Sequence, residues 1–179
     1  MVDLPRLAIS VRQPWAWAII YGGKDIENRR WSVYSPSRRF TGRVAIHASS
    51  GMTRNEYREA AEFMEKLGVT CPPAVDLVRG AIIGTVEIIG SVTRVSRPTT
   101  SKWFVGRFGL VLRGPEPIPE PIPVSGQLGF FKWERNGKIM PPAKWMLPVT
   151  PSESIKRRNP EPEGNLFSTD TEPVGNSPP

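Results

Sequence analysis

A dense group of charged residues follows the glycine pair Gly22-Gly23. A strand over residues 25–31 would place four side chains on one face, because successive side chains of a strand alternate: Asp25, Glu27, Arg29 and Trp31. Guanidinium and carboxylate groups in such a cluster recognise phosphate or the edge of a base. The alternative is an ion pair of Glu27 with Arg29 or Lys24 at the surface, which would have little consequence.

Lys24 is the strongest candidate for chemistry in this segment. The predicted turn at Gly22-Gly23 would fix its backbone at the mouth of a barrel, where the ammonium could reach a phosphate or a developing oxyanion. Glu27 could then act as a general base on water. On this interpretation Lys24 contributes little packing, and its replacement by alanine would not disturb folding.

Three more polar residues could join this site. Arg12 ends a predicted strand and Gln13 precedes a predicted helix, so both could point to the same end of the fold. His47, the only histidine, lies near the end of another predicted strand. A lone histidine is more often a hydrogen-bonded structural residue than a catalyst, and both interpretations stay open.

Glu87 and two tryptophans complete the candidate set. Glu87 lies within an otherwise apolar strand, so it should either pair with Lys24 or Arg29 or act as a general acid or base. Trp31 and Trp103 have basic or hydroxyl neighbours, Ser101 among them, which suits a base that stacks while its phosphate is held. For each tryptophan the alternative is a place in the wall of the core.

The elements that must position these residues alternate between strands and two helices. The helix expected at residues 14–21 is apolar all round and must be buried, and the one at 53–67 begins with a capping-box pattern, Thr-Arg-Asn-Glu. Strands are expected at residues 7–12, 25–31, 42–48, 81–92, 108–113 and 128–134. Gly84 and Gly90 should bend the longest strand, and the proline-rich segment 115–123 reads as an extended connection.

Composition limits the remaining possibilities. The chain has 179 residues and a formal net charge of +7; residues 151–179 carry three basic and five acidic side chains, so they contribute −2 and leave +9 on the rest. A basic body favours polyanionic partners. Cys71 is the only cysteine, which excludes an internal disulfide and a cysteine-based zinc cluster. We expect one domain at residues 5–148, a disordered Pro/Glu-rich tail at 149–179, no membrane span, a cytoplasmic location and a monomer.

Several segments in order resemble the ASCH domain family. They are I-S-V-R-Q-P-W-A-W-A-I-I-Y-G-G-K-D-I-E-N-R from Ile9, G-R-V-A-I-H-A from Gly42, R-G-A-I-I-G-T-V-E-I from Arg79, W-F-x-G from Trp103 and P-I-P-V-S-G-Q-L-G-F-F from Pro121. The resemblance implies an α+β fold, a PUA-like small β-barrel flanked by two main helices. Members are proposed to bind RNA, to act as ribonucleases or to deacetylate acetylated cytidine nucleosides.

The resemblance supports one catalytic residue and departs at another. Acetylated-cytidine amidohydrolases carry a Gly-x-Lys-x-x-Thr pattern, and this chain keeps the lysine at Lys24 but has Glu27 in place of the nucleophilic threonine. We therefore expect an RNA- or nucleoside-binding protein that is either a hydrolase using Lys24 with Glu27 or Glu87, or a non-catalytic binding module. P-loop, H-E-x-x-H and Cys/His metal patterns do not occur, so no cofactor is predicted; only a Mg²⁺ held by carboxylates and phosphate stays open.

Overall fold

The computed structural model describes residues 4–31, 35–95 and 99–148. The main compact unit is residues 1–147. The strands are β1 (Leu7–Val11), β2 (Ile26–Arg29), β3 (Gly42–Ala48), β4 (Ala81–Thr93), β5 (Phe108–Pro123) and β6 (Phe130–Lys132). The helices are α1 (Trp15–Tyr21) and α2 (Arg54–Lys66), with single 3₁₀ turns η1 (Pro36–Arg39), η2 (Ala74–Asp76) and η3 (Lys144–Met146). The tail expected at 149–179 lies outside the described residues.

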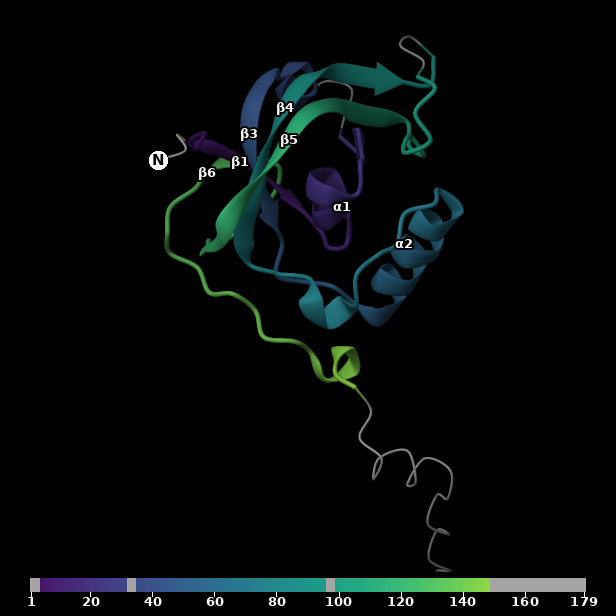
Figure 1. The fold of residues 1–179 in the computed structure, drawn as a ribbon. Coiled ribbons are helices and arrows are strands. Elements are labelled where there is room, and N and C mark those ends of the chain that lie inside the picture. The colour runs from purple at the N-terminus through teal and green to yellow at the C-terminus, as the bar shows by residue number, and fades with distance from the viewer. Residues whose placement is uncertain (1–3, 32–34, 96–98, 149–179) are drawn as a thin grey trace, which may run out of the picture. The chain divides into compact units, whose positions relative to one another are not determined.

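The described strands form one six-stranded sheet in the order β2-β5-β4-β3-β1-β6. β1 runs parallel to β3, and the other neighbours are antiparallel. Figure 1 shows the sheet curled into a half-barrel, with the long strands β3, β4 and β5 bent around α1. The fold is therefore α+β, as predicted, with the curled sheet as its framework.

The curl of the sheet depends on irregularities in β4. Its register shifts against β5 between Ile82 and Gly84 and between Ile88 and Gly90, which confirms the two predicted bend points. Gly84 also admits α1, because a Cβ at this position would lie 2.7 Å from Ile20 Cδ1. A glycine here therefore serves both the bend and the close approach of the helix.

Helix α1 fills the concave side of the sheet. Ala16, Ala18, Ile19 and Ile20 are buried, as the apolar pattern predicted. Ala16, Ile19 and Ile20 pack with residues of all the long strands, such as Val44, Val86 and Leu110. Burial of this helix thus ties the strands to a common core.

Helix α2 begins with the predicted capping box. The Thr53 side chain accepts a hydrogen bond from the Glu56 backbone N–H, and the Glu56 carboxylate accepts one from the Thr53 N–H. The helix buries Ala60 and Met64 against the outer side of α1 and Trp103. Its apolar face is core, as predicted.

The proline-rich segment corrects one prediction. Residues 115–123 are not a free connection but the second half of β5, which pairs with β4 from Ala81↔Pro123 to Thr85↔Glu116. The prolines fall at every second position from Pro115 to Pro123. The nitrogens of alternate residues in a strand face the same edge, so all five prolines lack an N–H on one edge of β5. In this half of β5 that edge is not covered by β2, and no N–H is needed there for a hydrogen bond between strands. The even spacing of the prolines is the sequence signal for this part of the strand.

The last described residues pack in a small apolar cluster that is separate from the core of the sheet. Met146 of η3 is buried with Met52, Ala74 and Leu77, and Trp145 packs near Tyr57 with ring centroids 6.0 Å apart. Trp145 and Met146 thus belong to the packed structure. No helix in the described part of the chain has the length and hydropathy that a bilayer span requires.

We predict that a chain ending at Thr150 melts within about 2 °C of the full chain, because residues 151–179 offer little apolar surface to offset the entropy of ordering them. The measurement is thermal unfolding followed by circular dichroism. A control ending at Gly137 loses Trp145 and Met146 and should melt ~5 °C lower or more. Loss of most of the stability in the Thr150 variant would contradict this domain boundary.

Candidate functional site: a polar cleft beside beta 1

An open cavity of about 500 Å³ lies where β1, β2 and β3 approach one another. It is lined by residues most of which have polar side chains: Ser10, Val11, Arg12, Trp15, Glu27, Arg29, His47, Ser49, Ser50, Gly126, Gln127 and Leu128. We call this cavity the cleft. It brings together four of the residues predicted from the sequence, namely Arg12, Glu27, Arg29 and His47.

Two members of a chain of three charged side chains line the cleft, Glu27 and Arg29, and the third, Lys24, lies behind them. Glu27 lies between two cations, with its Oε2 3.3 Å from Lys24 Nζ and its Oε1 3.2 Å from Arg29 Nε. The Arg29 contact is close but poorly aligned for a hydrogen bond, since Nε has no hydrogen-bond partner among the described residues. Arg29 Nη2 donates a 2.6 Å hydrogen bond to the Ser10 carbonyl. The three side chains are mutually positioned, and Glu27 and Arg29 present atoms to the cleft.

Lys24 is buried, which corrects the expectation that it lies at the mouth of the barrel. Its side chain is 2% exposed, and Nζ donates to the Ile26 carbonyl as well as pairing with Glu27. The rings of Trp15 and Trp103 lie nearby, with centroids 5.8 and 6.0 Å from Nζ. Burial lowers the pKa of Lys24, and the neighbouring Glu27 carboxylate opposes that effect. Lys24 does not line the cleft; it holds Glu27 in place.

Arg12 provides the exposed cation of the cleft. Its side chain is half exposed and forms a 2.7 Å ion pair with Glu56, the capping residue of α2. Gly51 lies against the guanidinium, since a Cβ there would be 3.3 Å from Nη2. Arg12 thus has a defined position and keeps a solvent-facing side from which it could bind an anion.

His47 forms a hydrogen-bonded pair with Ser10 on the wall of the cleft. Its Nε2 lies 3.0 Å from the Val124 carbonyl and its Nδ1 3.0 Å from Ser10 Oγ. A carbonyl only accepts, so Nε2 carries the hydrogen and, in the neutral ring, Nδ1 accepts from the serine hydroxyl. Burial lowers the pKa of His47, against a smaller opposing effect of the Val124 hydrogen bond, and so favours the neutral ring.

Ser10 was not predicted, although the sequence held a signal for it. It is two residues before Arg12 in the strand predicted at residues 7–12, so the alternation of a strand would put both on one face. Ser49 was also missed; its buried hydroxyl has no hydrogen-bond partner among the described residues. Gln127 and Ser50 come from loops, where no periodicity predicts which way a side chain points.

Gln13 has a structural place instead of a free polar end. It is 2% exposed; its amide nitrogen donates to the Val78 carbonyl, and its Oε1 accepts from the Trp17 backbone N–H. Both ends of the amide are therefore used to fix the start of α1, and the side chain is absent from the walls of the cleft.

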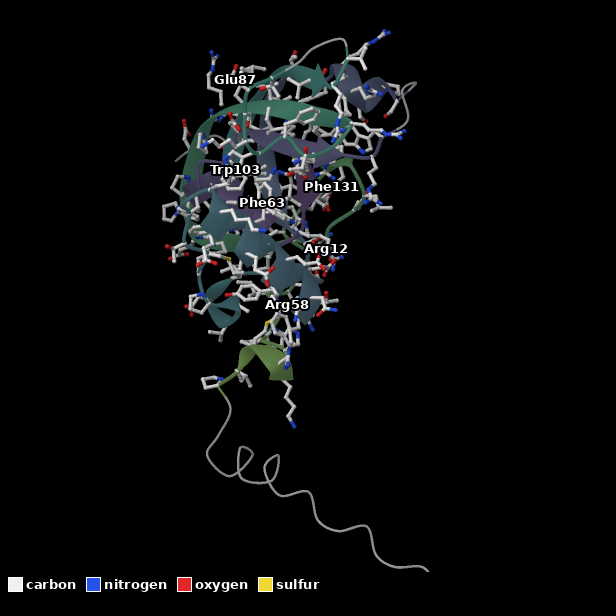
Figure 2. All side chains as sticks on the ribbon, turned by 90° about the vertical axis from the view of Figure 1, so that its right-hand side faces the viewer. Arg12, Arg58, Phe63, Glu87, Trp103 and Phe131 are labelled. Carbon is white, nitrogen blue, oxygen red and sulfur yellow. The ribbon has the colours of Figure 1, made fainter. Side chains whose placement is uncertain are left out.

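Glu87 is not brought to the cleft. The prediction that it pairs with Lys24 or Arg29 is wrong, because it forms a 3.1 Å ion pair with Arg113 of the neighbouring strand β5. The Arg113 side chain is largely exposed, and that of Glu87 is partly exposed. Figure 2 shows Glu87 near one end of the molecule, well away from Arg12. The bulges of β4 change which face each residue occupies, and strict alternation could not foresee them.

The two candidate tryptophans lie in different surroundings. Trp103 is 8% exposed and packs with Ala18, Ile26 and Met64, so it is a wall of the core. The neighbouring Ser101 donates a hydrogen bond to Asp25 Oδ1, away from the cleft. Trp31 is only partly buried and has the Arg29 guanidinium 5.5 Å from its ring centroid.

Among the described residues, no group of three or more His, Cys, Asp or Glu side chains could hold a metal ion.

This curled α+β sheet with a polar, arginine-bearing cleft defines a protein of the PUA-like class. The sequence profile of the ASCH domain matches residues 9–104, more than half of the chain. The chain belongs to the ASCH domain family, whose PUA-like fold is associated with RNA binding.

Comparison with known proteins adds one named structure. Eight chains of solved structures match. Among them is the crystal structure of a serine-to-alanine mutant of the ZmASCH protein from Zymomonas mobilis, with 22% sequence identity, coverage of 65% of this chain and 72% of that chain, and a TM-score of 0.33. No curated protein shows significant sequence similarity to the chain.

We predict that Lys24→Met lowers the free energy of unfolding by about 3 kcal/mol, because it removes one partner of a buried ion pair and leaves Glu27 with Arg29 alone. The double variant Lys24→Met/Glu27→Gln should lose less than the sum of the two single variants. Urea unfolding of the parent, the two single variants and the double variant measures both free-energy changes.

The control for this prediction is Lys102→Met, which changes the same residue type at an exposed position and should cost below about 0.5 kcal/mol. A Lys24→Met variant as stable as Lys102→Met would contradict the burial of the ammonium.

Proposed function

We propose that this protein binds single-stranded RNA and holds one nucleotide in the cleft. The observation that carries the proposal is the cleft itself: a cavity of about 500 Å³, within the usual range for small-ligand sites, with Arg12, Glu27 and Arg29 on its walls. The fold's association with RNA binding and the +9 charge of residues 1–150 support the same partner.

The polar groups of the cleft divide into two kinds by their chemistry. The guanidinium groups of Arg12 and Arg29 suit phosphate oxygens, which accept paired hydrogen bonds from a planar fork. The Glu27 carboxylate only accepts, so it suits an amino or imino group on the edge of a base. A nucleotide offers both a phosphate and such an edge, whereas a free inorganic anion offers nothing to Glu27.

Unpaired RNA fits this arrangement better than a duplex. The bases of a duplex are stacked and paired, and their edges are not free to enter a cavity lined by residues as deep as Glu27 and His47, 8% and 1% exposed. A splayed nucleotide of a single strand can enter with its base edge free. The cleft thus favours loops and single-stranded ends.

We predict that Arg12→Ala weakens binding of a short single-stranded oligoribonucleotide about tenfold at low salt and makes the affinity less dependent on salt, because one phosphate contact is lost. Fluorescence anisotropy at several salt concentrations measures both quantities. Arg113→Ala is the matched control: it also removes an exposed arginine from an Arg–Glu ion pair, but one on β5 outside the cleft.

Equal effects of Arg12→Ala and Arg113→Ala would contradict a role for the cleft. Absence of binding by the parent at low salt would contradict the proposed function as a whole.

A second candidate function is hydrolysis of an N-acylated nucleoside, which the Ser10–His47 pair favours. Ser10 Oγ would attack the acyl carbon and pass its proton to His47 Nδ1, 3.0 Å away, and the amine would leave with that proton. Water, deprotonated by His47, would then release the acyl group from Ser10. Lys24 is a less suitable cation for this reaction, since its ammonium is used by Glu27 and the Ile26 carbonyl.

We predict for this candidate that Ser10→Ala lowers turnover of N-acylated cytidine by at least about a thousandfold, while nucleoside binding changes less than about threefold. Chromatography of the products measures turnover, and mass spectrometry detects an acyl group on Ser10. Unchanged turnover in Ser10→Ala would exclude this serine as nucleophile. If the parent protein yields no product from acylated nucleosides or RNA, hydrolysis is excluded and RNA binding is the one remaining candidate function.

A further inference from the structure

A second and larger cavity lies on the other side of Arg29. Its volume is about 1150 Å³, and arginines from separate segments converge on it: Arg29 and Arg30 at the end of β2, Arg38 in η1, Arg94 after β4 and Arg107 before β5. Trp31 and Phe108 supply aromatic walls. No Asp or Glu is among the described residues that line this cavity, which we call the arginine groove.

Four of the five arginines of this groove have no carboxylate partner among the described residues. Elsewhere on the surface Arg12, Arg43, Arg58 and Arg113 each pair with a glutamate. None of the ion pairs found among the described residues includes Arg30, Arg38, Arg94 or Arg107. Several positive charges around one cavity without a counter-ion repel one another and raise a positive potential there, which an anionic ligand would relieve.

Two of the guanidinium groups are held in place by contacts that leave donors free. The Arg38 guanidinium lies over the Phe108 ring at 4.2 Å from its centroid. Arg94 uses Nε to donate to the Gly106 carbonyl, which leaves its terminal nitrogens available. Groups positioned in advance lose less entropy when they bind, so this is a prepared site rather than a cluster of loose side chains.

The aromatic wall is fixed as well. Trp31 packs against Phe108 and Phe130 with ring centroids 6.1 and 5.5 Å apart. It is partly exposed and lines the groove. A rigid, partly exposed indole beside guanidinium groups is a platform on which a base can stack while its phosphate is held.

The groove and the cleft are neighbours, because Arg29 lines both. We propose that the arginine groove binds the phosphodiester backbone of the RNA strand whose nucleotide occupies the cleft, with one base stacked on Trp31. This inference rests on the proposed function and extends it from one nucleotide to a strand. Evenly repeated phosphates match arginines spread along a groove, and the aromatic wall favours a nucleic acid over an acidic peptide.

The test compares two labelled RNAs, a dinucleotide and a decanucleotide, by fluorescence anisotropy. The variant is Arg94→Ala/Arg107→Ala, and the matched control is Arg58→Ala/Arg113→Ala, which removes the same charge from outside both cavities. We expect the groove variant to weaken decanucleotide binding by ~30-fold or more and to lower the salt slope by about 1.4, for two lost contacts to a single strand. The control should change affinity less than about threefold.

A third variant, Arg94→Lys/Arg107→Lys, keeps the charge and should restore most of the salt slope even if the alanine variant is destabilised. Decanucleotide binding that is equal in the groove variant and the control would overturn the inference. So would a poly-glutamate peptide that binds in a groove-dependent way while the decanucleotide does not.

The dinucleotide separates this inference from the proposed function. Dinucleotide binding that depends on Arg12 but gains nothing in the decanucleotide would support the cleft and overturn the groove. Decanucleotide binding that depends on the groove, without any dinucleotide binding, would support the groove as a backbone site and contradict the nucleotide cleft.

Discussion

Burial of the Lys24 ammonium is the interaction on which the cleft depends. A buried lysine beside two tryptophan rings has lost its water, and the Ile26 carbonyl and Glu27 must offset that cost. Glu27 in turn positions Arg29, which donates to the Ser10 carbonyl of β1. β2 and β1 are separated by three other strands in the order of the sheet. The charge chain therefore joins strands that the sheet itself does not join, and it does so across the concave side of the curl.

The curl makes that contact possible, and it has its own physical causes. Bulges near Gly84 and Gly90 bend β4, and α1 fills the space that the bend encloses. Along the second half of β5 the alternate prolines remove N–H donors from an edge that has no strand partner. Such an edge is a poor template for pairing with another chain, so the half-barrel ends there without a further strand.

The sequence predicted the elements better than the site. Periodicity and capping found α1, α2 and most strands, because these signals are local: the apolar α1 and the Thr53–Glu56 box need no knowledge of the rest of the chain. The charges at Lys24, Glu27 and Arg29 were also grouped correctly. The burial of Lys24 was not predicted, because it is set by Trp15 and Trp103, which lie far from one another in the sequence. For the same reason the Ser10–His47 pair, which joins residues 37 positions apart, was beyond local patterns.

On the proposed function, the distribution of carboxylates between the two cavities would orient a bound strand. The cleft contains Glu27, which repels phosphate and attracts the donor groups of a base, and its cations are Arg12 and Arg29. The described walls of the arginine groove contain no carboxylate. A strand that passes Arg29 therefore lowers its electrostatic energy by turning a base toward Glu27 and its phosphates toward the arginine groove. Arg29 could not be replaced by lysine without loss at both ends, since one guanidinium contacts Glu27 and the Ser10 carbonyl and still faces both cavities.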